Sequence, residues 1–230
     1  MSTDYSGIGS LNEKSLHRQL KDLYLQAGCV QEHLVGSYYV DVRTHEKLIE
    51  IQTGSFSSMK KKLNYLLKDH KVLLVHPVTA EKYITTLEED EQTIRSRRKS
   101  PKKQGFHHAA GQLMYIYTFL DHPNFACELL LTEEEEIRID DGQGSWRRKG
   151  VSLSDRVLIK IRGKKSFTAK EDYLSLLPEG LPERFTNNDL GKLVSGTKRD
   201  TGKLSYLLKK LELIECVEKK GNSQVFMRLY

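Results

Sequence analysis

The chain has 230 residues, of which 38% are hydrophobic and 30% are charged. This composition excludes a disordered chain, and the length suits one large domain or a medium domain with a small one. No apolar run approaches the roughly 18 residues of a membrane-spanning helix, and the first ten residues lack the pattern of a secretory signal. The three cysteines have neither disulfide nor metal-site spacing, so we expect a cytoplasmic protein with reduced thiols and no membrane partner.

The excess of positive charge is confined to the C-terminal third. Residues 151–230 hold 16 Lys and Arg against 10 Asp and Glu, whereas residues 1–150 hold 21 of each, so the net charge of +6 comes from the C-terminal part alone. Such asymmetry favours an anionic partner for this part, and nucleic acid is the usual one.

The N-terminal half predicts a mixed α/β sheet. Leucines recur at helical spacing until Gly28, and the almost wholly apolar run Val72–His76 is typical of a strand buried on both faces. In chain order we expect a helix over 11–27, strands over 37–42 and 47–52, a helix over 57–67, and strands over 72–76 and 83–87. An antiparallel pair followed by a crossover helix gives a mixed sheet flanked by helices.

Charged runs separate the elements in the middle of the chain. Residues 95–103 hold six cations and no acid, which predicts a flexible basic loop. The four consecutive acids of 133–136 predict a solvated turn or edge. Around these runs we expect a helix over 111–120, a strand over 125–131, a last strand over 157–161 and a linker near 163–166.

The pattern changes after the linker. We expect helices over 171–177, 186–194 and 200–211, then strands over 214–218 and 224–229, joined by the hairpin turn KKGNS at 219–223. Helix, turn, helix and hairpin in this order are typical of a winged helix. The sequence therefore predicts two domains, an α/β domain over residues 1–165 and a winged helix-turn-helix domain over residues 166–230.

Two acidic residues in the expected β-hairpin carry the chemistry. Asp41 lies late in one strand, and Glu50 and Gln52 lie in the next, where alternation places them on one face. Asp41 faces them across the hairpin. Together with the carbonyl of Ile51, the two carboxylates predict an all-oxygen site for Mg²⁺ or Mn²⁺. An ion in such a site activates water and neutralises charge on a reacting phosphate.

This arrangement over residues 11–76 resembles the PD-(D/E)XK nuclease superfamily, which has a restriction-endonuclease-like mixed sheet. That superfamily places an acid in one strand and E-x-K in the next, and a preceding helix often supplies a further Glu. The resemblance implies Asp41 as the first acid, Glu50 as the second, and Glu13 (less readily Glu32) as the helix acid. It implies a metal-dependent endodeoxyribonuclease that hydrolyses DNA directly, without a covalent intermediate.

Gln52 departs from the superfamily pattern because most members have Lys there. A neutral amide orients water but supplies no positive charge. Lys60, on the following helix, is our candidate for the missing ammonium. If the site is inactive, the chain is instead a non-catalytic DNA-binding regulator or adaptor on a degenerate nuclease fold.

Basic residues in two regions are expected to contact DNA. The N-terminal part of the second winged-helix helix approaches the major groove, and the hairpin tip meets phosphates. The expected contacts are Arg95, Arg97, Arg98, Lys99, Lys102 and Lys103 in the basic loop, and Lys198, Arg199, Thr201, Lys203, Lys219, Lys220 and Asn222 in the winged helix. Winged helices also bind proteins, which leaves a protein-interaction module open, and paired nuclease sites favour a homodimer.

Overall fold

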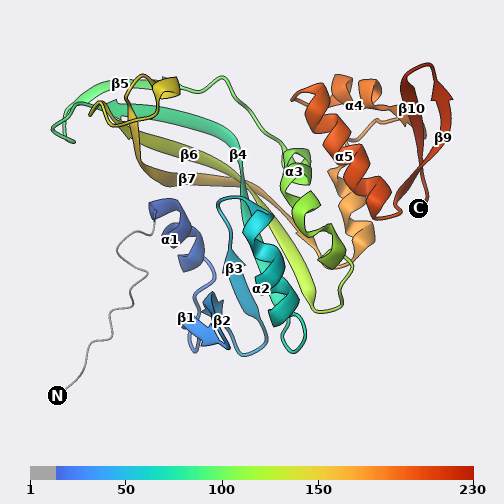
Figure 1. The fold of residues 1–230 in the computed structure, drawn as a ribbon, viewed down its shortest axis with the longest axis horizontal. Helices are drawn as coiled ribbons and strands as arrows, with labels where there is room; N and C mark the ends of the chain where they lie inside the picture. The colour runs from blue at the N-terminus through green and yellow to red at the C-terminus, as the bar shows by residue number, and fades with distance from the viewer. Residues whose placement is uncertain (1–13) are drawn as a thin grey trace.

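A seven-stranded mixed sheet forms the centre of the protein in a computed structural model that describes residues 14–230 (Figure 1). Its order is β1-β2-β3-β4-β6-β7, with β5 paired to β4. β3 with β4 and β4 with β6 are parallel, and the other pairs are antiparallel. The strands are β1 (Val30–Val35), β2 (Tyr38–Arg43), β3 (Leu48–Ile51), β4 (Val72–Leu87), β5 (Ile94–Lys99), β6 (Phe125–Ile139) and β7 (Ser152–Phe167).

Helices cover both faces of this sheet. α1 (Ser15–Asp22) turns Leu16 and Leu20, four residues apart, onto one face, where they pack with Ile49 and Val75. α2 (Met59–Leu66) and α3 (Ala110–Leu113) cover the other face, with the short 3₁₀ helices η2 (Phe56–Ser58), η3 (Phe106–Ala109) and η4 (Met114–Phe119). The expected α/β class, a mixed sheet flanked by helices, is confirmed. None of the helices in residues 14–230 is long and apolar enough to cross a membrane.

Three strands are much longer than the sequence predicted. The segments expected as strands 72–76 and 83–87 form one strand, β4, which runs through Pro77. Proline interrupts a strand where its missing N–H is needed. β3 pairs with β4 only as far as Val75, so Pro77 lies where that edge of β4 has no neighbour. Similarly, β7 continues through 163–166, the expected linker, and remains paired with β6.

The expected basic loop and the expected acidic turn are both strands. Residues 133–136 lie inside β6, between β4 and β7, and residues 94–99 form the edge strand β5. Their charged side chains form ion pairs with one another and with charged side chains of the neighbouring strands. The ion pairs are Glu133–Arg162, Glu134–Arg156, Glu135–Arg97, Glu136–Lys82, Lys99–Glu81 and Arg95–Asp140. A run of like charge read along the chain does not reveal the opposite run that pairs with it across the sheet.

The C-terminal elements lie near their predicted places. They are η6 (Lys170–Leu176), β8 (Arg184–Thr186), α4 (Asn187–Leu193), α5 (Lys198–Lys210), β9 (Ile214–Lys220) and β10 (Ser223–Arg228), with a small sheet of order β8-β10-β9. The strands β1 and β8 and the short helix η5 (Trp146–Arg148) are additions to the prediction. One hydrophobic cluster runs from the sheet to this region and includes Leu63, Phe167, Leu204 and Phe226. The two predicted domains therefore share a core.

Tyr173 offers a test of this shared core. Its ring is fully buried and stacks on Phe167 at a centroid distance of 4.5 Å and an interplanar angle of 12°. Its hydroxyl is buried and has no hydrogen-bond partner among residues 14–230. Because an unpaired buried hydroxyl costs about 1–3 kcal/mol, Tyr173→Phe should increase the free energy of unfolding measured with urea. Tyr173→Ala is the contrasting variant and should lower it by about 3–5 kcal/mol. A clear loss of stability in the Phe variant would show that the hydroxyl has a partner.

Candidate functional site

Asp41 and Glu50 meet where β2 and β3 separate. The strand register pairs Arg43 with Leu48 and Val42 with Ile49 and ends there, one residue short of Asp41 and Glu50. Beyond that point the Ile51 N–H has no partner strand on the β2 side, and the Asp41 carboxylate accepts it at 2.6 Å. The two acids therefore lie just past the last strand pair, and the negative charge of Asp41 acts on Glu50.

α1 contributes a histidine to this pair. The His17 Nε2 atom lies 3.4 Å from Asp41 Oδ2. Burial opposes ionisation of Asp41, but the hydrogen bond and charge of His17, the Ile51 N–H and the charge of Lys62 outweigh it. The pKa of Asp41 is consequently lowered. Asp41 is thus an anion held in place from two sides.

Glu50 has the opposite electrostatic character. It is only 4% exposed, and burial, aided by the negative charge of Asp41, raises its pKa to about 7 against the opposing charge of Lys62. The Lys62 ammonium, from α2, lies 2.6 Å from Glu50 Oε1 and also donates to the Tyr39 carbonyl at 2.5 Å. Two adjacent carboxylates therefore differ in proton affinity, and the second titrates near neutral pH.

The lysine that contacts Glu50 is Lys62, and not the predicted Lys60. Residues two apart on a helix point in nearly opposite directions. Lys60 is exposed to solvent on the outer side of α2, whereas Lys62 turns inward. The sequence signal for Lys62 was available, because it lies three residues after the buried Met59.

The remaining predicted catalytic residues have separate outcomes. Gln52 directly follows β3, and its amide donates to the Ser55 carbonyl at 2.9 Å, so its side chain holds the following turn. Glu32 forms an ion pair with Lys21 at 2.8 Å instead of joining Asp41. Glu13 lies outside the described residues. His17 was missed because a single His in an amphipathic helix carries no distinctive pattern.

The donor set fits a hard divalent cation. Magnesium is commonly bound by one or two carboxylates, with water and substrate phosphates completing its shell. Asp41 and Glu50 supply the carboxylates, and the Ile51 carbonyl lies on the same edge of β3 as its N–H, towards Asp41. Within residues 14–230, no group of three or more His, Cys, Asp and Glu side chains is placed to hold a metal. Any ion here would therefore depend on backbone, water and substrate oxygens.

The basic residues of β5 are largely engaged with the sheet. Alternation turns Arg95, Arg97 and Lys99 towards acids, and the Arg97 guanidinium also lies 4.6 Å from the centroid of the Tyr83 ring. Arg98 and Lys103 are exposed, and Lys102 lines a pocket beside β4. Part of the predicted DNA contact therefore has a structural role.

The predicted contacts on α5 divide in a similar way. Lys198 and Arg199 are exposed at its first turn. Thr201 is only 2% exposed and donates to the Lys198 carbonyl at 3.1 Å, so little of its side chain is accessible, although it lines the groove described next. Lys203 lies over Gly111 of α3, where an added β-carbon would come within 3.0 Å of its ammonium. The packing of α5 against α3 removes Lys203 from a free helix surface.

A basic groove lies between α4, the first turn of α5 and the β9–β10 hairpin. Its volume is about 890 Å³. Five predicted contacts line it: Lys198, Thr201, Lys219, Lys220 and Asn222. Asn187, Asn188 and Lys192, which were not predicted, line it as well. No acidic side chain is among the residues that line this groove. The structure thus gathers the C-terminal cations on one concave surface.

The comparisons with known proteins identify a family. Residues 14–168, from the start of α1 to the end of β7, match the family described as "Domain of unknown function (DUF8091)". An uncharacterized protein of Treponema pallidum (strain Nichols) is 33% identical over 190 residues, which cover 82% of this chain and 75% of the relative. No solved structure matches the chain.

The raised pKa of Glu50 predicts an unusual pH dependence of stability. The folded chain keeps a proton on Glu50 up to about pH 7, whereas the unfolded chain releases it near the ordinary value of 4.5. Rising pH through this window therefore favours unfolding. Glu50→Gln should gain stability relative to the native chain between about pH 4.5 and 7, with a constant difference above that, in urea titrations with EDTA.

Glu46→Gln is the matched control, because Glu46 is exposed in the turn between β2 and β3. Its stability should follow that of the native chain at every pH. If the difference between the Glu50→Gln variant and the native chain stayed flat from pH 4 to 8, the pKa assigned to Glu50 would be wrong.

Proposed function

The chain belongs to the DUF8091 family, and from the geometry of its site we propose that it is a metal-dependent endodeoxyribonuclease. The observation that carries the proposal is the proximity of Asp41 on β2 to Glu50 on β3, next to the lysine that contacts Glu50. The order helix, strand with an acid, strand with E-x-Q supports the resemblance to the PD-(D/E)XK superfamily. We further propose the finer fold assignment on this basis, with a winged helix at the C-terminus.

Asp41, Glu50 and the Ile51 carbonyl would hold Mg²⁺ or Mn²⁺. A bound ion of this kind lowers the pKa of water and draws negative charge from a phosphodiester. The hydrogen bond from the Ile51 N–H already orients the Asp41 carboxylate, so binding of an ion would require little rearrangement of this side chain. The pKa of Glu50 is about 7, so near neutral pH the binding of a cation would be coupled to the release of the Glu50 proton.

Lys62 supplies the positive charge that Gln52 lacks. Its ammonium lies beside Glu50. In most members of the superfamily, a lysine at the position of Gln52 would supply the positive charge here. An ammonium in this position stabilises the negative charge that develops on the phosphate as water attacks. Gln52 acts by holding the turn through Ser55 and so positions the end of β3.

The basic groove is the proposed DNA-binding surface. Three features support a winged helix there: the two helices α4 and α5, the hairpin β9–β10, and the strand β8 that completes the small sheet. The lysines of α4, of the first turn of α5 and of the hairpin converge on one cleft, which suits a phosphate backbone. In this proposal the groove tethers DNA and the Asp41–Glu50 site cuts it. A cytoplasmic location and a homodimer, which would pair two such sites, remain part of the proposal.

One observation favours a second candidate. Lys62 pairs directly with Glu50, and such an ion pair also satisfies a buried carboxylate without any metal. A chain in which this pair is purely structural would be a non-catalytic DNA-binding regulator or adaptor. If the groove instead binds protein, the isolated chain would show little affinity for DNA.

Plasmid cleavage separates these candidates. With Mg²⁺ or Mn²⁺ the native chain should nick supercoiled plasmid, and EDTA should abolish the reaction. Lys62→Ala should reduce the rate by roughly 100-fold, because it removes a charge that stabilises the transition state, and Glu50→Ala should do the same. Lys60→Ala, two residues away and exposed, should cleave at the native rate.

Circular dichroism and DNA affinity should be unchanged in all three variants. Absence of cleavage by the native chain, with DNA still bound, would favour the regulator. Equal losses in the Lys60 and Lys62 variants would remove Lys62 from the site.

DNA binding by the groove has its own prediction. The double variant Lys198→Ala/Lys219→Ala should weaken duplex binding and reduce the slope of log affinity against log salt by about 0.9 for each phosphate that the protein no longer neutralises. The control Lys68→Ala/Lys209→Ala removes two exposed lysines outside the groove and the same net charge. Fluorescence anisotropy over a range of salt concentrations measures both. Equal slopes for the two double variants would mean that DNA binds elsewhere.

A further inference from the structure

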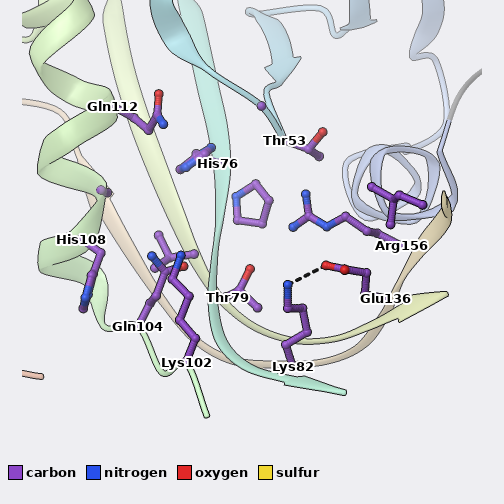
Figure 2. A pocket seen from close by; sticks show the side chains of 15 residues that line it. Thr53, His76, Thr79, Lys82, Lys102, Gln104, His108, Gln112, Glu136 and Arg156 are labelled. Carbon is purple, nitrogen blue, oxygen red and sulfur yellow. Dashed lines mark hydrogen bonds and ion pairs between the residues drawn. The ribbon is translucent and has the colours of Figure 1, made fainter. Parts of the chain in front are cut away.

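A second pocket, separate from the basic groove, opens beside the end of β3. Its volume is about 440 Å³, within the range of small-ligand sites. It lies between the turn at Thr53 and Gly54, the middle of β4, the start of the α3 region and β7 (Figure 2). Neither the two carboxylates of the proposed active site nor the lysines of the basic groove line it.

Positive charge dominates this pocket. Lys82, Lys102 and Arg156 line it, and Glu136 is the acid among the lining residues. Glu136 is already bound by Lys82 at 2.5 Å and by Arg138 at 2.5 Å. Its charge is therefore more than neutralised before any ligand is present.

Arg156 is fixed in an orientation that leaves donors for a ligand. Its Nη2 atom binds Glu134 at 2.5 Å, and this carboxylate is fully buried and also accepts from the Thr132 hydroxyl at 2.6 Å and the Thr79 hydroxyl at 3.0 Å. A guanidinium has five N–H donors. Within residues 14–230, its Nε and Nη1 atoms have no hydrogen-bond partner. A planar group held from behind in this way suits an oxyanion in front of it.

Lys102 approaches from the opposite wall. Figure 2 shows the Lys102 and Arg156 side chains reaching into the pocket from two sides, with His76 between them and the α3 region. Lys102 forms no ion pair with the described residues. Its charge is therefore available to a ligand, unlike that of Lys82.

The pocket is connected to the proposed active site through the end of β3. The Gln52 carbonyl binds His76 Nδ1 at 2.5 Å, and the next two residues, Thr53 and Gly54, line the pocket. Thr53 is the third residue after Glu50, so the Cα atoms of these two residues are at most about 11 Å apart. Successive phosphates of one DNA strand advance about 3.4 Å along the axis. A strand cut at Glu50 would place a phosphate a few nucleotides away at this pocket.

We propose that this pocket binds a phosphate group of the nucleic-acid strand, through Lys102 and the free guanidinium donors of Arg156. The proposal rests on the proposed function for its ligand, but the site is defined by its own residues. The group is either an internal phosphodiester or a terminal phosphate of the strand. In both cases the pocket fixes the position of the strand relative to Asp41 and Glu50.

The test uses inorganic phosphate and the full chain in EDTA, followed by ³¹P NMR line broadening, so that no metal bridges phosphate to the carboxylates. The native chain should bind phosphate saturably, and Lys102→Ala should weaken binding about tenfold, as expected for loss of one charge-assisted hydrogen bond. Lys68→Ala is the matched control, because Lys68 is an exposed lysine that lines neither this pocket nor the basic groove. Equal losses in the two variants, or no saturable binding by the native chain, would overturn the proposal.

Single-stranded oligonucleotides with and without a 5′-phosphate identify the source of the group. If Lys102→Ala weakens binding of both, the pocket holds an internal phosphate; if it weakens only the phosphorylated strand, the pocket holds a terminal one. Plasmid cleavage without phosphate binding would overturn this inference alone. Phosphate binding that depends on Lys102, in a chain that does not cleave DNA, would support the pocket and overturn the nuclease proposal.

Discussion

The burial of Glu134 at the centre of the sheet is the constraint on which the outer half of the molecule depends. Glu134 is fully buried, and an unpaired carboxylate there would be strongly destabilising. Arg156 from β7 and the hydroxyls of Thr79 and Thr132 satisfy it, which ties β4, β6 and β7 together at one point. These three strands extend well beyond the helices as a curved ribbon (Figure 1). The same arginine forms a wall of the phosphate pocket, so the structural ion pair and the proposed ligand site share one side chain.

The two carboxylates of the proposed active site show how local geometry gives neighbouring groups different chemistry. Asp41 gains a backbone N–H and a histidine, and these interactions hold it as an anion. Glu50 lies deeper and next to a negative charge, and Lys62 offsets only part of that cost. An acid that stays ionised and an acid that titrates near pH 7 are together suited to bind a cation and release a proton. The same pair with Lys62 alone would instead be a stable but inert salt bridge.

The packing of the C-terminal elements limits which of their surfaces is open to a partner such as the proposed DNA. α5 lies against α3, where the Lys203 side chain lies over Gly111. The His107 ring binds the Ser195 carbonyl at 2.7 Å in the turn before α5. A helix held this way presents its first turn to a ligand, and the rest of the helix packs against the core. The open surface is the groove between that turn, α4 and the hairpin, which four lysines line; Lys192 and Lys220 also pair with Asp189 and Glu218.

The sequence by itself determined the class of fold, the two central acids and most C-terminal elements, because these depend on local periodicity and on residues nine apart in one hairpin. It predicted the pairing of Asp41 with Glu50, which follows from strand alternation. Helical spacing separates Lys62 from Lys60, but only the tertiary structure placed the inner face of α2 beside Glu50. The tertiary structure also decided how the runs of like charge are neutralised. Residues 95–99 and 133–136 lie far apart in sequence, and only the pairing of β4 with both β5 and β6 brings their opposite charges together. Long-range pairing across a sheet leaves no periodic trace along either strand.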